Sequence, residues 1–353
     1  MMILLALFWQ AAFVFFIGQS RGISLDKLLR GWDAGWYLRI AGEGYSGSGW
    51  AFFPLYPLMI AGMSEVTGML LTIAGLTLSL TCYGAAISIY LRASAVETSA
   101  IHLPRGNNLG WCLFVFSPAA WVFFHPHTES LYLLLLCGTL FFWGKRQWVL
   151  AAAIAGLSAL TKNQGSFLAL ATGLAAGFDW WRGGRGIRRS FGIFAVCGVI
   201  SCGLYALFPL YQCWVTGDPF RFLHAQVEWR AEMSWASYVR TFWFGNPWQN
   251  TNFGSLIHHA FFFVLVWCVA CFATARPRDL IWVYFAIHVG IMPLSGELVT
   301  DFRYGAVLLP LWLMGGRWLF QFKWKFLPSA ALIVTLVLHQ IMLRNSLIGR
   351  WAY

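Results

Sequence analysis

Charged residues are scarce in this sequence. They make up 10% of its 353 residues, whereas an average soluble domain carries about 25%. Hydrophobic residues account for 59%, so the composition excludes an ordinary soluble domain and favours an integral membrane protein. The formal net charge of +11 would suggest a nucleic-acid partner in a soluble protein. In a membrane protein it reflects lysines and arginines retained on cytoplasmic loops, and we predict no nucleic-acid partner.

Several motifs are also missing. The sequence has no internal repeat, which leaves an inverted-repeat transporter without support. No histidines follow a metal-ligand spacing such as H-E-x-x-H. The eight cysteines lie in apolar runs, and Cys268 and Cys271 form a C-x-x-C without a second pair, so we predict buried thiols rather than a zinc or redox site. Residues 1–17 lack a basic first region and a small-residue cleavage site, so we predict a retained first helix.

Long apolar runs recur along the whole chain, many of them able to cross about 30 Å of hydrocarbon. Several runs are short, so one or two could be re-entrant or strongly tilted. We predict an all-α polytopic membrane bundle that forms one domain over residues 1–353. About eleven spans are expected, near residues 2–19, 68–91, 107–123, 130–143, 148–161, 164–180, 191–214, 258–275, 279–294, 304–320 and 327–343.

The distribution of charge predicts the orientation. With the N-terminus in the cytoplasm, 13 of the 24 basic residues fall on the inner side, most of them on short loops, as the positive-inside rule requires. Only three of the 13 acidic residues fall there, Glu97, Asp179 and Asp279. Solvation of larger outer loops would explain the other ten, but so would a polar working face on the outer side, which we favour.

Two predicted outer segments, residues 20–67 and 215–257, are too long to be simple connectors. Both are rich in tryptophan, tyrosine, phenylalanine and arginine, which settle at the level of the lipid headgroups. Within the second segment, residues 235–253 are predicted to form an interfacial helix and turn. Both segments are therefore expected at the membrane surface.

Asp33 lies in the first outer segment, just after the first span. Trp32, Trp36 and Ile40 recur at helical spacing and could rest on lipid or on the bundle, so that Asp33 projects toward water or a cavity. A carboxylate there could act as general base on an acceptor hydroxyl. It could equally cap a helix beside Gly31, and the residues alone leave both interpretations open.

The motifs around Asp33 resemble those of a known family. W-D-x-x-x-Y-x-x-I-A-x-x-G-Y over residues 32–45, followed by F-F-P-x-Y-P over residues 52–57, resembles the GPI mannosyltransferase II (PIG-V) family and its bacterial relatives, which are C-type (GT-C) glycosyltransferases. The resemblance extends over about residues 30–315. Further matching motifs follow in the same order: P-H-T-E-S-L at 126–131, A-L-T-K-N-Q-G at 159–165, G-D-P-F at 217–220 with A-Q at 225–226 and Trp229, and F-R-Y at 302–304.

The resemblance implies an inverting transferase on the outer or lumenal face of a lipid bilayer. Its donor would be a polyprenyl- or dolichyl-phosphate sugar, with mannose the favoured sugar, and its acceptor a lipid-linked or other hydroxyl. It assigns the role of catalytic base to Asp33. Arg303 and Lys162, each at the outer end of a predicted helix, are the candidates for binding the donor phosphate, which needs fixed positive charge as its bond to the sugar breaks. Snorkelling of both cations to the interface is the alternative.

The other candidates are assigned by position. Residues predicted to contact sugar or acceptor are Trp32, Tyr37, Asp218, His224, Gln226, Trp229 and Tyr304. The residues of the second outer segment could equally well belong to an aromatic stripe at the membrane interface without contacting sugar or acceptor. Glu129 and Asn163 are predicted to support the site, and Glu129 could neutralise Lys162 or Arg303 or cap the helix that follows it.

Two departures from the family pattern limit what the resemblance implies. The family usually has arginine where Lys162 stands, and lysine lacks the two-pronged guanidinium that suits a phosphate. Some C-type transferases carry an Asp-x-Asp in the first loop, which is missing here, so no cofactor is predicted and a divalent metal stays an alternative. His125, in the sequence His125-Pro126-His127, has no assigned role.

Two other functions stay open. A flippase or transporter of lipid-linked sugars would use the same polar residues as one end of a pathway, but it should also place charges near the middle of the membrane. A non-catalytic subunit of a transferase complex would keep the fold without the transfer. The compact loops favour a bacterial plasma membrane, with the site on the periplasmic side, over the endoplasmic reticulum.

Overall fold

The computed structural model describes residues 2–95, 103–182, 187–226, 253–275, 280–292 and 301–349. Helices make up 81% of the structure, and no residue in these ranges lies in a strand. The predicted all-α class is therefore confirmed. Most predicted spans coincide with a single helix: α1 (Met2–Arg21), α5 (Leu71–Ala95), α7 (Glu129–Gly144), α8 (Trp148–Ala159), α9 (Gly165–Arg182), α10 (Ile187–Thr216), α13 (Phe253–Ala275), α14 (Leu280–Ile291) and α17 (Leu327–Leu347).

The helices have the apolar character of membrane segments. Four of them, α1, α5, α10 and α17, contain stretches long and apolar enough to cross a membrane, and α7, α8, α9, α13 and α14 contain shorter apolar stretches. Large apolar side chains such as Phe8, Phe15, Leu210 and Trp214 are exposed on α1 and α10, as expected where lipid is the solvent. The count of eleven spans stays a prediction, because the 16 residues of α7 extend only about 24 Å at about 1.5 Å per residue.

Two predicted spans are interrupted. Residues 107–123 form α6 (Asn108–Val115) and the 3-10 helix η2 (Ala120–Phe124), and residues 304–320 form α15 (Asp301–Ala306) and α16 (Leu309–Leu319). Proline accounts for both breaks, at Pro118 between the first pair and at Pro310 in the first turn of α16. A continuous helix would need an N–H at each of these positions to bond the carbonyl four residues earlier, and proline has none.

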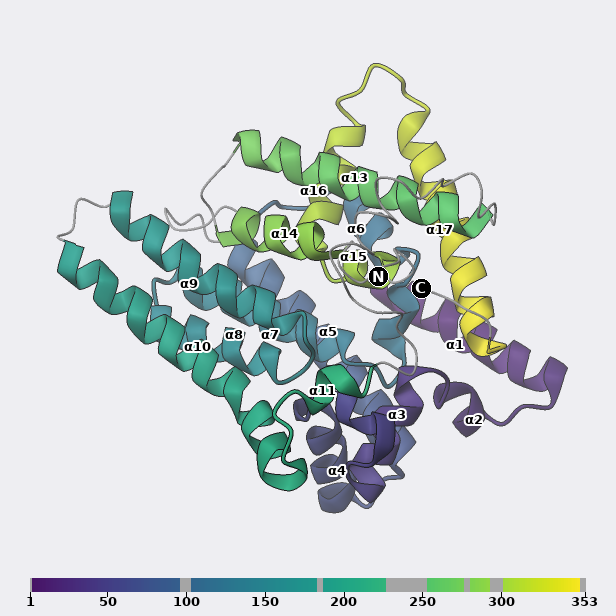
Figure 1. Ribbon diagram of the computed structural model, residues 1–353. Coiled ribbons are helices and arrows are strands. Elements are labelled where there is room, and N and C mark those ends of the chain that lie inside the picture. The colour runs from purple at the N-terminus through teal and green to yellow at the C-terminus, as the bar shows by residue number, and fades with distance from the viewer. Residues whose placement is uncertain are drawn as a thin grey trace.

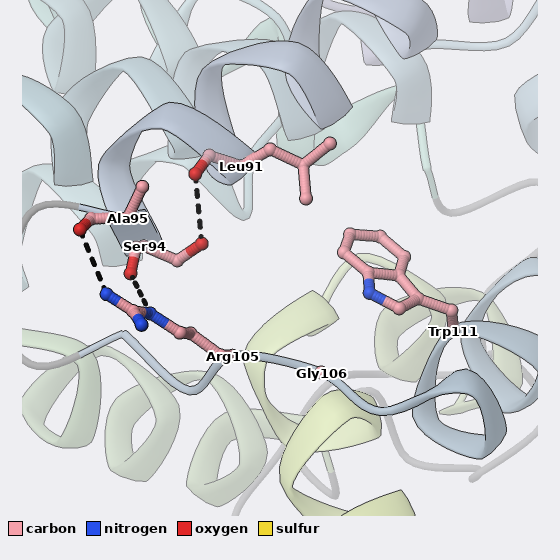
Figure 2. A pocket seen from close by; sticks show the side chains of 6 residues that line it. All are labelled: Leu91, Ser94, Ala95, Arg105, Gly106 and Trp111. Carbon is pink, nitrogen blue, oxygen red and sulfur yellow. Dashed lines mark hydrogen bonds between the residues drawn. The ribbon is translucent and has the colours of Figure 1, made fainter.

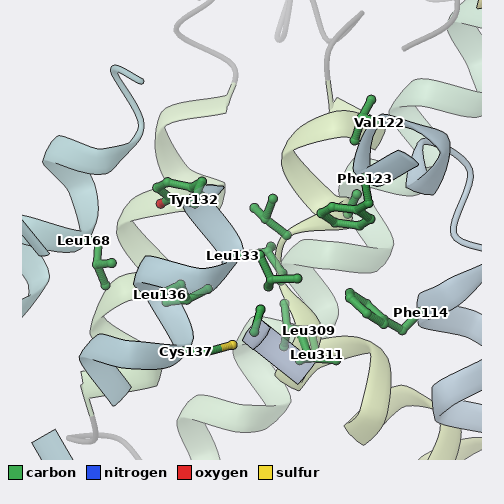
Figure 3. Close-up of a cluster of buried hydrophobic side chains, with 14 of the residues drawn as sticks. Phe114, Val122, Phe123, Tyr132, Leu133, Leu136, Cys137, Leu168, Leu309 and Leu311 are labelled. Atoms are coloured by element: carbon green, nitrogen blue, oxygen red, sulfur yellow. The ribbon is translucent and has the colours of Figure 1, made fainter. Parts of the chain in front are cut away.

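Helix α7 lies inside the core. It packs against α5 and α8, and its buried side chains point to more than one side, as in a helix that is enclosed by other helices. Figure 3 shows these side chains among those of α6, α9 and α16. The residues drawn there include Phe114, Tyr132, Leu133, Leu136, Cys137, Leu168, Leu309 and Leu311. This packing fixes the position of the first residue of α7, Glu129.

The first outer segment folds into packed helices. These are α2 (Leu25–Leu29), α3 (Asp33–Glu43), η1 (Gly47–Ala51) and α4 (Leu55–Thr67). The short α11 (Arg221–His224) of the second outer segment lies beside them, as Figure 1 shows. Phe222 meets Phe53 with ring centroids 5.5 Å apart. The two outer segments therefore meet, although the predicted interfacial helix and turn at 235–253 falls, except for its last residue, outside the described residues.

The charges separate along the bundle. Helix α7 runs from Glu129 to Lys145 and Arg146, which stand just past its end. Helix α5 begins beside Asp26, whose carboxylate accepts a hydrogen bond of 2.6 Å from the Thr72 hydroxyl, and it carries Arg92 in its last turn. The neighbouring helices α5 and α7 thus share an acidic end and a basic end, which is the polarity expected from the distribution of charge. All eight cysteines are free thiols.

Candidate active site

An ionic cluster brings together residues from four separate parts of the chain. The Arg303 guanidinium donates from Nη1 to Asp33 Oδ2 and from Nε to Glu129 Oε1. Lys162 Nζ donates to the same Glu129 oxygen over 2.5 Å. Asp33 and Arg303 are 270 positions apart in the sequence. The predicted base, the predicted phosphate ligands and the predicted supporting carboxylate are therefore in one network.

Burial changes across this cluster. The side chain of Glu129 is 0% exposed, that of Arg303 8%, that of Lys162 11% and that of Asp33 29%. Glu129 is thus the buried anchor and Asp33 the member nearest to the surroundings. In the part of the chain that the structure describes, two cations face two carboxylates, so the formal charges of these four side chains sum to zero. Such pairing is what makes charged side chains tolerable in a buried place.

Helix α3 begins at Asp33 because the backbone turns sharply at Trp32. Trp32 has a φ of 57° and a ψ of −136°, a conformation that costs a bulky residue on the order of 1–3 kcal/mol and is typical of functional sites. Its indole donates to the carbonyl of Ser346 at the end of α17 over 3.3 Å. Trp32 itself is the N-cap, without a side-chain capping bond. The interpretation of Asp33 as the capping residue was therefore wrong, and its carboxylate instead points to Arg303.

Glu129 is positioned by the turn that precedes α7. A carboxylate in the first turn of a helix is stabilised by the helix dipole, and Thr128 lies between Glu129 and Tyr37, with oxygen distances of 3.5 Å and 3.4 Å. The turn fits closely against α5, where a Cβ added to Gly75 would lie 3.0 Å from Pro126. Glu129 therefore pairs with the two cations and lies in the first turn of α7, while the N-cap of this helix is Thr128.

Lys162 is positioned by the turn between α8 and α9. This turn is so tight that a Cβ on Gly165 would lie 1.9 Å from the carbonyl oxygen of Ser158, and only glycine can occupy that position. The Lys162 ammonium lies 5.9 Å from the ring centroid of Tyr132 and 5.8 Å from that of Tyr304, at cation–π distance. Burial lowers the pKa of Lys162, while the Glu129 carboxylate opposes this shift.

The histidines that precede Glu129 are part of this region. His125 and His127 are 3% and 0% exposed, and the His125 Nδ1 lies 3.0 Å from the carbonyl of Trp121. Burial, assisted by the nearby Arg303, lowers the pKa of His127 to about 3, so its imidazole is neutral. Within the described part of the chain, neither ring nitrogen of His127 has a hydrogen-bond partner. The motif at residues 126–131 contains His127, but no role was predicted for it from the sequence, and only its position two residues before Glu129 could have indicated one.

Tyr304 and Tyr37 border the cluster in different ways. Tyr304 is half-buried next to Lys162, and its carbonyl lies 3.2 Å from the His288 Nε2. Tyr37 is buried, and its ring packs edge-on against Phe52 and Tyr56 at 5.2 and 5.3 Å. Tyr304 thus borders the cluster through its ring, which lies beside the Lys162 ammonium, whereas Tyr37 reaches the cluster through its contact with Thr128.

The predicted residues of the second outer segment form a separate group. His224 Nδ1 lies 2.7 Å from Asp218 Oδ2, and this bond lowers the pKa of Asp218. The Gln226 amide donates to the carbonyl of Phe222 over 3.0 Å. Phe222 and Leu160 belong to one apolar cluster, so the group approaches the turn that holds Lys162. Trp229 lies outside the described residues.

Asn163 occupies the same turn as Lys162. Its carbonyl accepts hydrogen bonds from the backbone N–H and the hydroxyl of Ser166, over 3.0 and 2.7 Å. These bonds help to form the start of α9. Asn163 therefore supports the turn through its backbone.

Two surface cavities lie elsewhere in the bundle. The first, of about 360 Å³, is lined by Leu91, Ser94, Ala95, Arg105, Gly106 and Trp111, and Figure 2 shows Arg105 bonded there to the carbonyls that end α5. The second lies between residues 319–325 and the start of α17. Along α5, the 16 residues from Ser79, which contacts the His127 carbonyl, to Ala95 extend about 24 Å. The first cavity is therefore far from the ionic cluster.

The cluster contains the kinds of group that can bind an anion and accept a proton. Among the described residues, no three His, Cys, Asp or Glu side chains form a group that could hold a metal ion. Fixed positive charge is supplied here by Arg303 and Lys162. The most exposed member, Asp33, can accept a proton once its bond to Arg303 opens.

Comparison with known proteins gives one match. Residues 3–162 match the family model described as Mannosyltransferase (PIG-V), which confirms the resemblance derived from the motifs. The matched region contains Asp33, Glu129 and Lys162, while Arg303 lies beyond it. No curated protein and no solved structure matches the chain. The match and the apolar helices support a membrane glycosyltransferase of the mannosyltransferase type.

Proposed function

We propose that this membrane glycosyltransferase moves mannose from a polyprenyl- or dolichyl-phosphate donor to a hydroxyl of a lipid-linked or other acceptor, with inversion at the sugar carbon. The observation that carries the proposal is the ionic cluster, in which one partly exposed carboxylate, Asp33, meets the cations Arg303 and Lys162. A transfer from a lipid phosphate needs both a base for the acceptor and positive charge for the leaving phosphate.

The sugar is transferred in a single nucleophilic displacement at the anomeric carbon. The acceptor oxygen attacks the anomeric carbon from the side opposite the phosphate, which inverts that centre. Its proton passes to Asp33, and the electron pair of the breaking bond between carbon and phosphate oxygen stays on the lipid phosphate. The phosphate gains negative charge in this step, and Arg303 and Lys162 stabilise it because they are fixed before the reaction begins.

Other residues of the region would surround the sugar and the acceptor. Tyr304, beside Lys162, and Trp32, next to Asp33 in the chain, are the aromatic candidates for this role. Asp218, His224 and Gln226 approach from the second outer segment, next to the apolar cluster that contains Phe222 and Leu160. Tyr37, Asn163 and Glu129 would act by holding these groups in place.

The proposed side of action is the outer or periplasmic face of a bacterial plasma membrane. The cluster lies at the acidic end of α5 and α7, and basic residues such as Arg92, Lys145 and Arg146 lie at the other end. Basic loops remain in the cytoplasm. This separation supports an active site on the opposite side of the membrane.

Mass spectrometry of reaction products tests the proposal directly. The purified protein is incubated with defined polyprenyl-phosphate sugars and candidate lipid acceptors, and we expect mannosylated product with the wild type. Asp33→Asn should reduce transfer at least about 100-fold, since a general base contributes about 10²–10⁴. Glu43→Gln, at the exposed far end of α3, is the control and should transfer normally.

Other results would favour the other functions. Movement of labelled lipid-linked sugar across vesicles without any transferred product would indicate a flippase. Undiminished transfer by Asp33→Asn would remove Asp33 from the mechanism. Transfer that appears only when a second protein is added, and that persists when Asp33 is replaced, would indicate a supporting subunit.

A further inference from the structure

The resting cluster keeps its own base occupied. Asp33 Oδ2 accepts a hydrogen bond from Arg303 Nη1, so one of the two carboxylate oxygens of the base is held by a guanidinium. A hydrogen bond between charged groups is among the stronger ones in proteins. In this state the bond orients the Asp33 carboxylate toward Arg303 and occupies its Oδ2 atom.

Arg303 holds its two carboxylates with different atoms and at different depths. Its Nε binds Glu129, which is fully buried, whereas its Nη1 binds Asp33, which is 29% exposed. Glu129 is held additionally by Lys162. An anion that reaches the cluster would therefore exchange with Asp33, because that bond is nearest to the surroundings and its carboxylate has a single ionic partner among the described residues.

The formal charges of the cluster and of the donor phosphodiester are compatible with an exchange of Asp33 for the phosphate. Among the described residues, the two cations and two carboxylates of the resting cluster have formal charges that sum to zero, and without Asp33 the remaining Glu129, Lys162 and Arg303 carry a net charge of +1. The phosphodiester of a lipid-phosphate sugar carries one negative charge. It would therefore restore neutrality when it takes the place of the Asp33 carboxylate, which matters in a buried site where unpaired charge is costly.

We propose that Asp33 is the resident anion of the donor's phosphate site, and that the donor phosphodiester displaces it from Arg303. The displaced carboxylate is then free to take the proton of the acceptor. Donor binding thereby switches on the base, and the donor binds before the acceptor is deprotonated. This inference rests on the proposed function, because it assigns the displaced anion and the reacting base to the same residue.

Binding and transfer, measured on the same variants, separate the possibilities. The probe is a polyprenyl monophosphate without sugar, titrated into purified full-length protein. Asp33→Asn and Asp33→Ala should bind it about tenfold more tightly than the wild type, since a competing charged hydrogen bond is worth on the order of a factor of ten, although both should lose transfer. Glu43→Gln removes the same charge from the same helix and should change neither quantity.

Two results would overturn the exchange. If Asp33→Asn loses transfer but binds the monophosphate equally well or more weakly, the proposed function stands and the exchange is wrong. If the wild type neither binds the monophosphate nor transfers any sugar, the proposed function fails, and the exchange fails with it.

A second measurement avoids variants that might misfold. In the wild type, carbodiimide labelling followed by mass spectrometry should show Asp33 becoming at least about threefold more reactive when monophosphate is added, because its ion pair opens. Glu129 should stay unreactive in both states, and Glu43 serves as the constant reference. Unchanged or lower labelling of Asp33 in the presence of the monophosphate contradicts the exchange.

Discussion

Glu129→Gln should be far more destabilising than Asp33→Asn, although each substitution removes one carboxylate from Arg303. Glu129 is fully buried and binds both Arg303 and Lys162 through one oxygen. Among the described residues, its loss leaves two buried cations with Asp33 as their one counter-charge. Removal of one partner from a buried ion pair costs about 3–5 kcal/mol. Asp33 is partly exposed, and its replacement should cost less than about 1 kcal/mol.

The double substitution Glu129→Gln and Lys162→Met provides the internal check. The cluster then contains Arg303 and Asp33 only, and its formal charge returns to zero. We expect it to recover about 1–3 kcal/mol relative to Glu129→Gln alone, since residues in one network are not additive. Lys162→Met by itself should be destabilising, because it leaves a second carboxylate without a matching cation.

Reversible unfolding in mixed micelles measures these free energies. Wild type, Glu129→Gln, Asp33→Asn, Lys162→Met and the double variant are compared under one set of conditions. Two results would refute the proposed arrangement: equal free energies of unfolding for Glu129→Gln and Asp33→Asn, or a double variant that loses more free energy of unfolding than the two single variants lose together. Either result would mean that Glu129 does not anchor the two cations.

Three further predictions concern the surroundings of the cluster. Gly165→Ala should destabilise the protein by more than about 3 kcal/mol and abolish transfer, because its Cβ would overlap the Ser158 carbonyl. Gly173→Ala, in the same helix α9 with nothing within 4 Å of the added Cβ, should be neutral or slightly stabilising; equal unfolding free energies for the two variants would contradict the tight turn. His127→Leu should be neutral or stabilising, because it removes a buried imidazole whose nitrogens have no partner among the described residues, and a fall in transfer with unchanged stability would identify His127 as part of the mechanism. Lys162→Arg should retain most of the transfer, whereas Lys162→Met should lower kcat about 10²–10³-fold. Steady-state kinetics in which Lys162→Met has as high a kcat as Lys162→Arg would exclude a role of this charge in the reaction.

The sequence contained the members of the site but not their contacts. Asp33, Lys162, Glu129 and Arg303 were each proposed from motifs or from charges at the ends of apolar runs. Direct pairing of Asp33 with Arg303 joins segments 270 positions apart, and periodicity contains no information on such pairs. The prediction that Glu129 could neutralise either cation did not indicate that it binds both through the same oxygen.

Hydropathy predicted correctly where helices lie, but it did not predict that two of the spans are interrupted. Each predicted span coincides with helical structure, because an apolar run in a membrane protein has no other way to satisfy its backbone. The two prolines, Pro118 and Pro310, could have predicted the breaks in these spans. A mean hydropathy taken over a long window does not detect a single proline. The folding of residues 20–67 into α2, α3, η1 and α4 depends on packing of Tyr37 and Tyr56 against α5, which composition does not encode.

The four charged side chains of the ionic cluster are not expected to stabilise the fold. Buried ion pairs are often no more stable than apolar residues of similar volume, and can be less stable by about 1–4 kcal/mol. A protein that needed only its fold would gain nothing from four charges in this place, so their presence is better explained by chemistry. A quadruple variant, Asp33→Asn with Glu129→Met, Lys162→Met and Arg303→Met, should therefore unfold with a free energy within about 2 kcal/mol of the wild type while losing all transfer. A quadruple variant that is much less stable than Glu129→Gln would show instead that the ionic network holds the bundle together.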